Sequence, residues 1–121
     1  MQIAPIALFV YNRPRHVRYC IESLQKNFFA DKSELFIFSD GVKDCGQEKN
    51  VRSVREYIRN IQGFKRLHIV EQPENKGLAS NIISGVTDLV EKYGRVIVLE
   101  DDLIVSPWFL TFMNEALETY K

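Results

Sequence analysis

The chain has 121 residues, which is enough for one domain with its own hydrophobic core. Sixteen basic residues balance sixteen acidic ones, so bulk charge gives no sign of a nucleic-acid-binding protein or of a polybasic membrane patch. No apolar stretch approaches the roughly 20 residues that span a bilayer, and the N-terminus lacks the basic start of a signal peptide. The two cysteines, Cys20 and Cys45, have neither metal-type spacing nor a disulfide framework, so we expect free thiols in a reducing compartment.

Apolar runs and helical periodicities alternate along the chain. We expect strands over residues 3–11, 35–38, 67–70 and 95–99, and helices over residues 14–28, 51–61, 78–93 and 107–117. Pro14 suits the first turn of the first helix, and Gly63 and Gly94 end the second and third. Ser106 and Pro107 form a start signal for the last helix, with a capping hydroxyl before a proline.

This order of elements predicts a fold class. Strands that alternate with helices favour a mostly parallel sheet with helices on both faces, and right-handed crossovers narrow this to a Rossmann-like α/β fold. The run Val96–Leu99 is β-branched and uninterrupted by polar residues, which predicts a buried central strand. The third helix should bury a stripe at helical spacing, made of Leu78, Ile82, Val86, Leu89 and Tyr93.

All four expected strands end in polar or charged residues. These ends read Tyr11-Asn12-Arg13, Ser39-Asp40-Gly41, Glu71-Gln72 and Glu100-Asp101-Asp102. The carboxyl ends of parallel strands meet at one edge of a sheet, where α/β proteins bind ligands. The set suits a nucleotide with a diphosphate, because a guanidinium grips phosphate oxygens and a carboxylate accepts a hydrogen bond from a base imino group.

The acidic triplet Glu100-Asp101-Asp102 is the most informative of these ends. Adjacent carboxylates repel one another and lose hydration energy unless a positive charge joins them. A divalent cation would supply that charge, because hard cations prefer oxygen ligands, and it could bridge to a phosphorylated substrate. The first strand–helix turn contains no glycine, and the chain has no Walker sequence, which argues against a dinucleotide fold or a backbone phosphate cradle.

Several segments, taken in order, resemble the GT-A glycosyltransferases. They are Ile6–Pro14, Phe38–Gly41, Asn75–Asn81, Val98–Leu103 and Ser106–Phe109. Within that fold the chain looks most similar to the N-acetylglucosaminyltransferase I type and to related bacterial sugar transferases. The resemblance covers essentially the whole chain and implies a GT-A nucleotide-diphospho-sugar transferase half. Residues 1–121 would then be the nucleotide-sugar-binding domain, the N-terminal part of a longer enzyme.

The resemblance also implies roles for the residues of the triplet. Asp102, the last acid of this DXD-like motif, would be the direct ligand of manganese or magnesium. Glu100 and Asp101 would contact the ribose, the sugar or metal-bound water.

Three further residues receive roles from the same resemblance. Arg13 would touch the diphosphate, Asp40 would accept a hydrogen bond from the uracil ring, and Asn81 would lie near the nucleotide. The family often has a basic or ring side chain at the position of Asn81. No residue of this chain matches a catalytic base.

These features favour a metal-dependent glycosyltransferase module that binds a nucleotide-diphosphate sugar, most consistent with a UDP-sugar, and transfers a hexosyl or N-acetylhexosaminyl group. The acceptor would be a carbohydrate or a lipid-linked hydroxyl, and the location the cytoplasm or the inner membrane face. Two alternatives remain open, a sugar-phosphate nucleotidyltransferase and a non-catalytic binding domain of the same fold. We expect residues 1–121 alone to have weak or no transfer activity.

Overall fold

The computed structural model describes residues 2–119 of the chain, which alternate strictly between strands and helices. The elements in order are β1 (Ile6–Val10), α1 (Pro14–Gln25), β2 (Glu34–Ser39), α2 (Glu48–Ile58), β3 (Arg66–Glu71), α3 (Leu78–Tyr93), β4 (Ile97–Glu100) and α4 (Phe109–Thr119). Short 3-10 turns over Ala30–Lys32 and Cys45–Gln47 precede β2 and α2. The expected order of elements is confirmed, with boundaries that differ by a few residues at several ends.

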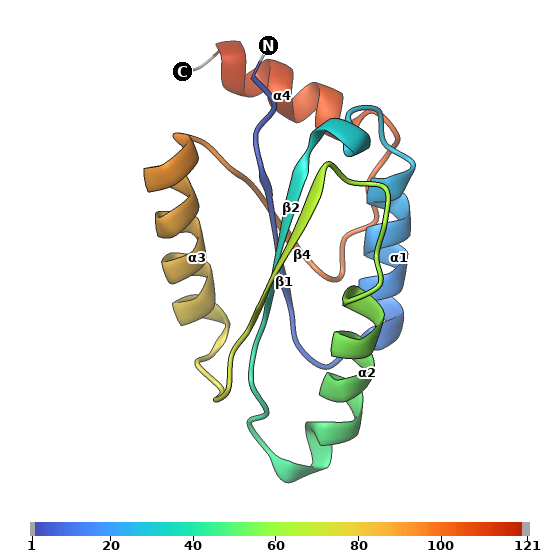
Figure 1. Ribbon diagram of the computed structural model, residues 1–121, viewed down its shortest axis with the longest axis vertical. Coiled ribbons are helices and arrows are strands. Elements are labelled where there is room, and N and C mark those ends of the chain that lie inside the picture. The colour runs from blue at the N-terminus through green and yellow to red at the C-terminus, as the bar shows by residue number, and fades with distance from the viewer. Residues whose placement is uncertain (1, 120–121) are drawn as a thin grey trace.

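The four strands form one parallel sheet in the order β3-β2-β1-β4. In the register of this sheet, Leu8 of β1 lies between Ile37 of β2 and Leu99 of β4. Figure 1 shows the sheet edge-on, with α3 on one face, α1 and α2 on the other, and α4 across the end where β1 begins. The predicted Rossmann-like α/β fold class is therefore confirmed.

Each face of the sheet has its own apolar core, because alternate strand residues point to opposite sides. On the first face, β1, β2 and β4 pack against α1, α2 and α4 through buried residues that include Leu8, Val17, Ile37, Ile58 and Leu110. On the second face, the sheet packs against α3 through Ala7, Phe9, Phe36, Phe38 and Leu89. Burial on both faces explains why β1 and β2 are almost continuously apolar in the sequence.

The expected burial of Val96–Leu99 as a central strand is wrong. In the part of the chain that the structure describes, β4 pairs only with β1 and lies at the edge of the sheet. Ile97 and Leu99 face the first core, whereas Val98 points to the α3 side and is 41% exposed. On that side α3 contacts β1, so this helix does not fully cover the edge strand β4.

The buried stripe of α3 also differs from the expectation at its first position. Leu78 is 54% exposed and lies at the helix start, whereas Ile82, Val86 and Tyr93 are partly buried against the second core. Asn81 takes the buried position in the first turn instead. Among residues 2–119, no helix is long and apolar enough to cross a membrane.

The start of α4 is capped by a residue that the sequence did not indicate. The backbone carbonyl of Ser106 accepts a hydrogen bond from Phe109 N at 3.1 Å, but the Ser106 hydroxyl does not cap the helix. Instead, Asn27 Oδ1, just after α1, accepts from Leu110 N at 2.9 Å. Its Nδ2 donates to the carbonyls of Ser23 and Ser106 at 2.9 Å each. Asn27 therefore supplies the capping acceptor that a helix N-terminus requires.

Candidate functional site

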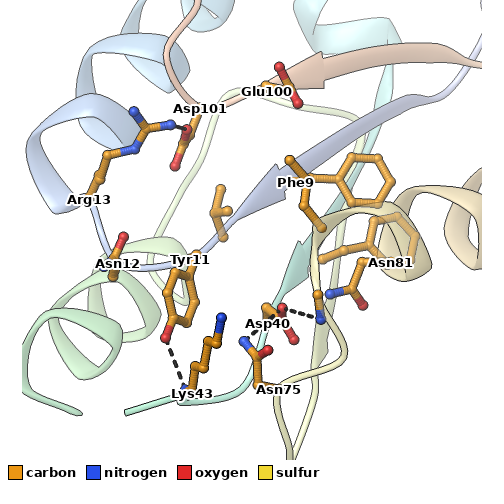
Figure 2. A pocket seen from close by; sticks show the side chains of 14 residues that line it. Phe9, Tyr11, Asn12, Arg13, Asp40, Lys43, Asn75, Asn81, Glu100 and Asp101 are labelled. Atoms are coloured by element: carbon orange, nitrogen blue, oxygen red, sulfur yellow. Dashed lines mark hydrogen bonds and ion pairs between the residues drawn. The ribbon is translucent and has the colours of Figure 1, made fainter. Parts of the chain in front are cut away.

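A pocket of about 440 Å³ opens at the carboxyl ends of the strands. It lies where the chain order of the sheet reverses, between β1 and β4, which is where open α/β sheets bind ligands. Figure 2 shows it from close by. Its lining residues are Phe9, Val10, Tyr11, Asn12, Arg13, Phe38, Asp40, Lys43, Asn75, Gly77, Leu78, Asn81, Glu100 and Asp101. Five of the six residues predicted to bind cofactor or metal are in this set, and the sixth, Asp102, is not.

Arg13 and Asp101 form an ion pair on one side of the pocket. Asp101 is buried, whereas the Arg13 side chain is 46% exposed. Burial raises the pKa of the Asp101 carboxyl, while the charge and hydrogen bond of Arg13 lower it, and the net pKa lies above the usual value. The positive group beside Asp101 in this structure is thus the Arg13 guanidinium, whereas the sequence analysis expected a divalent cation at the triplet and Arg13 at a diphosphate.

The three acids of the triplet do not converge on one point. Residues 101 and 102 form a turn in which Leu103 N donates to the Glu100 carbonyl at 3.3 Å. Asp101 turns inward, whereas Glu100 and Asp102 are exposed. Within residues 2–119, no three Asp, Glu, His or Cys side chains are arranged to share a metal ion. Glu100 and Asp102 nonetheless leave their oxygens free, which fits a cation such as Mg²⁺ that takes part of its coordination from substrate phosphates.

The thiol of Cys20 lies beneath this turn, with Sγ 3.8 Å from the Glu100 carbonyl oxygen. Burial raises the pKa of Cys20 to about 12, and the nearby carboxylates of Asp101 and Asp102 add to the rise. Such a thiol stays protonated and unreactive at neutral pH. Both Cys20 and Cys45 are free thiols, as the sequence predicted.

On the opposite side of the pocket, Asp40 holds two loops together. Its Oδ1 accepts from the backbone N–H groups of Gly41 and Lys76, both at 2.8 Å. Its Oδ2 accepts from Gly77 N at 3.0 Å and from Asn75 Nδ2 at 3.1 Å. Asn75 Nδ2 also donates to the Gly41 carbonyl at 2.9 Å. These bonds join the end of β2 to the loop of Asn75, Lys76 and Gly77, which we name the 75–77 loop.

Arg55 of α2 holds the ends of β2 and β3 in place, and it was not predicted from the sequence. Its Nη2 donates to the carbonyls of Ser39, Asp40 and Gln72 at 3.2, 3.0 and 2.8 Å, and its Nε donates to Ser39 Oγ at 2.9 Å. The ends of β2 and β3 are thus clamped to α2. The only sequence signal was a charged residue beside the apolar stripe of this helix.

Replacing Gly41 with alanine should break the close contact between the two loops. An added Cβ would lie 2.3 Å from the Glu74 carbonyl carbon, so backbone must move. We expect a loss of about 1–2 kcal/mol in the free energy of unfolding, in the range of overpacking costs. Urea unfolding would measure it. Gly46→Ala is the matched control, because nothing lies within 4 Å of its added Cβ; equal stability of both variants would contradict the close approach.

Asn81 occupies a core position of α3 at the inner end of the pocket. Asn81, Gly85 and Leu89 are the buried residues of this helix, spaced four apart on the face toward the sheet. A Cβ added at Gly85 would lie 3.0 Å from Cζ of Phe38, so the helix approaches the sheet closely there. Phe38 stacks on Phe9 with ring centroids 4.9 Å apart, and both rings line the pocket.

Several lining residues were not predicted as site residues. Lys43, Asn75, Phe9 and Phe38 all line the pocket, and the backbone N–H of Lys43 donates to the Tyr11 hydroxyl at 2.9 Å. Each of the four lies at a strand end or in a loop that follows one. A prediction that included every residue near the four strand ends, whatever its type, would have found them.

Comparisons with known proteins agree with this geometry. The model of the family described as glycosyl transferase family 2 matches residues 6–121. No curated protein matches the chain. The fold is similar to that in the crystal structure of TarS from S. aureus, with a TM-score of 0.67 and 16% sequence identity. That alignment covers 98% of this chain and 20% of the TarS chain, so the present chain spans a fifth of that protein's length. The chain belongs to glycosyl transferase family 2 and has the GT-A glycosyltransferase fold.

Proposed function

We propose that this chain is the donor-binding domain of a metal-dependent glycosyltransferase that uses a nucleotide-diphosphate sugar, with UDP as the nucleotide. One observation carries the proposal. In a chain of this family, the pocket at the strand-order reversal gathers Arg13, Glu100 and Asp101 opposite Asp40 and Asn81. A guanidinium and free carboxylate oxygens at one end, with an aromatic and amide-lined space at the other, match the two ends of a nucleoside diphosphate.

The roles proposed for the charged end follow from this placement. Arg13 binds the diphosphate, because its half-exposed guanidinium offers donors beyond those used by Asp101. Glu100 and Asp101 contact the ribose, the sugar or metal-bound water. Asp102 would hold a divalent cation, since carboxylate oxygens are the ligands that such hard cations prefer. When bound, a divalent cation stabilises negative charge on the leaving diphosphate as a Lewis acid.

The acceptor end of the reaction is proposed in the same terms. The group transferred is a hexosyl or N-acetylhexosaminyl unit, and the acceptor is a hydroxyl of a carbohydrate or of a lipid-linked sugar. We propose a cytoplasmic location, where lipid-linked acceptors would be reached at the inner membrane face. Because the chain spans 20% of TarS, transfer itself is proposed for a longer protein that contains this domain.

Calorimetric titration of the chain with UDP tests the metal assignment. We expect manganese to strengthen UDP binding by at least about tenfold, and Asp102→Asn to remove this gain, because a carboxylate binds a hard cation far better than an amide. In the presence of a chelator the variant and the natural chain should bind UDP equally. Asp88→Asn, on an exposed position of α3, is the matched control. Manganese-dependent binding that survives in Asp102→Asn would refute the role of Asp102.

A further inference from the structure

The largely buried guanidinium of Arg55 lies behind the pocket rather than in it. Arg55 belongs to α2, on the face of the sheet opposite α3, and it does not line the pocket. Its side chain is 19% exposed. Burying a charged group costs free energy unless hydrogen bonds or an opposite charge replace the lost water. The partners of this guanidinium therefore indicate why a charge is kept at this position.

Arg55 donates to four acceptors, all at the carboxyl ends of β2 and β3. Its Nε donates to the Ser39 hydroxyl at 2.9 Å, and its Nη2 donates to the carbonyls of Ser39, Asp40 and Gln72. Three of the four acceptors are backbone carbonyls from two neighbouring strand ends. The guanidinium thus joins the two ends through its planar set of donors.

An ion pair with Glu71 does not account for the burial of Arg55. One Glu71 oxygen lies 3.9 Å from Arg55 Nη1, which is longer than a hydrogen bond. The Glu71 carboxylate instead accepts two hydrogen bonds from the exposed Arg59, at 2.8 and 2.6 Å. The hydrogen bonds of Arg55 itself go to the strand ends.

The carbonyls that Arg55 binds lie at the start of two loops that form one wall of the pocket. The chain leaves β2 after Ser39, and Gln72 leads from β3 into the 75–77 loop. Asp40 and two residues of the 75–77 loop line the pocket, and hydrogen bonds join Asp40 to this loop. Arg55 therefore holds the base of both loops at the point where the pairing of β2 with β3 ends.

From these contacts we infer that Arg55 is a positioning residue for nucleotide binding, which keeps the ends of β2 and β3 at the spacing that the pocket wall requires. The inference rests on the proposed function, since it concerns the same pocket. A rigid fork of donors suits this role, whereas the ammonium of lysine is a point charge on a flexible stem. An apolar residue would fill the space but would leave the carbonyls without their donor.

Arg55→Lys should weaken UDP binding by about tenfold in the presence of manganese. The variant keeps the positive charge but cannot reach Ser39, Asp40 and Gln72 together, so the two loops should lose their fixed spacing. Misplacing a binding group by 1 Å can cost about 100-fold, and the loss here should be smaller because every residue of the pocket lining remains. Calorimetric titration of the full chain would measure the affinity.

Two control variants separate positioning from other effects of the change. Arg59→Lys is the same substitution one turn later on α2, at a side chain that bonds to Glu71, and it should leave UDP affinity unchanged. Asn27→Ala removes hydrogen bonds between the end of α1 and α4, away from the pocket. It should lower stability, measured by urea unfolding, without changing UDP affinity.

Amide hydrogen exchange tests whether the two loops loosen. In Arg55→Lys the N–H groups of Lys76 and Gly77 should exchange faster, because both bond to Asp40, whose backbone Arg55 holds. A loss of global stability alone would instead speed the slowest amides of β1. If Arg55→Lys does not fold, Ser39→Ala removes only the hydroxyl acceptor and should give a smaller loss of UDP affinity, about threefold, the scale of one hydrogen bond.

Equal UDP affinity in Arg55→Lys and in the natural chain would overturn the inference, as would an equal loss of affinity in Asn27→Ala. Failure of the proposed function has a different signature. The natural chain would then not bind UDP, with or without manganese, while the exchange of Lys76 and Gly77 in Arg55→Lys would still report whether Arg55 holds the loops.

Discussion

Replacing Arg13 with methionine should lower the free energy of unfolding by about 2 kcal/mol at neutral pH. The change removes the partner of Asp101 and leaves a buried carboxylate without a counter-charge. Breaking a fully buried pair costs roughly 3–5 kcal/mol, and the exposure of Arg13 to solvent reduces the expected cost. Urea unfolding of the natural chain and the variant would measure the difference.

The loss should depend on pH in a defined direction. The pKa of Asp101 in the folded chain lies above its usual value, and the charge and hydrogen bond of Arg13 limit that rise. Between the unfolded and folded pKa values the folded state binds more protons, so stability falls as pH rises through this window and then levels off. Without Arg13 the folded pKa rises further, so the fall is deeper and ends at higher pH. The variant should approach the natural chain near pH 4 and differ most at pH 7.

The double variant Arg13→Met with Asp101→Asn separates this effect from lost packing. Asparagine cannot ionise, so the added pH dependence should disappear and most of the stability should return. Arg13→Met alone with an unchanged pH profile would show that the ion pair contributes little to folding.

Replacing Asn27 with alanine should have a larger effect on stability, about 3 kcal/mol. The side chain is buried and makes three hydrogen bonds that join the end of α1 to the first turn of α4. Its loss leaves Leu110 N without its acceptor and removes a donor from the Ser23 and Ser106 carbonyls, although Ser106 keeps the bond from Phe109 N. Each unsatisfied buried group costs about 1–3 kcal/mol, less where water enters. Thermal and urea unfolding would both register the change.

Two variants serve as controls for Asn27. Ser106→Ala should change stability by less than about 0.5 kcal/mol, since its hydroxyl caps nothing and its carbonyl remains. Asn27→Asp keeps the acceptor for Leu110 N but loses both donated bonds, so its stability should lie between the natural chain and Asn27→Ala. A greater loss of stability in Ser106→Ala than in Asn27→Ala would show that Ser106 caps α4, as the sequence predicted.

Much of the fold could be predicted because its signals are local. Periodicity of 3.6 residues marked α2 and α3, and continuous apolar runs marked β1 and β2. The position of β4 in the sheet could not be predicted in the same way. An apolar run reports that a strand buries side chains, but the number of neighbouring strands depends on pairings that are distant in sequence. Val98 is apolar and yet half-exposed for that reason.

The same difference between local and long-range signals applies to the candidate site. Parallel topology brings all strand ends to one edge, so Arg13, Asp40, Glu100 and Asp101 could be placed together from their positions alone. The hydrogen-bond and ion-pair partners of these residues could not be predicted. Whether Asp101 pairs with a cation or with Arg13, and whether Asp40 faces a ligand or the 75–77 loop, depends on side chains from 35 to 88 residues away. Composition and residue spacing do not show which of these long-range pairs form.

The hydrogen bond from Leu110 to Asn27 joins residues 83 positions apart in the chain. The first turn of α4 thus gains its acceptor only after the segment following α1 has taken its final shape. The pairing of β1 with β4 joins residues that are comparably distant in sequence, such as Ile6 and Ile97. Both ends of the C-terminal segment, β4 and α4, are therefore held by the first quarter of the chain, and such long-range contacts slow folding.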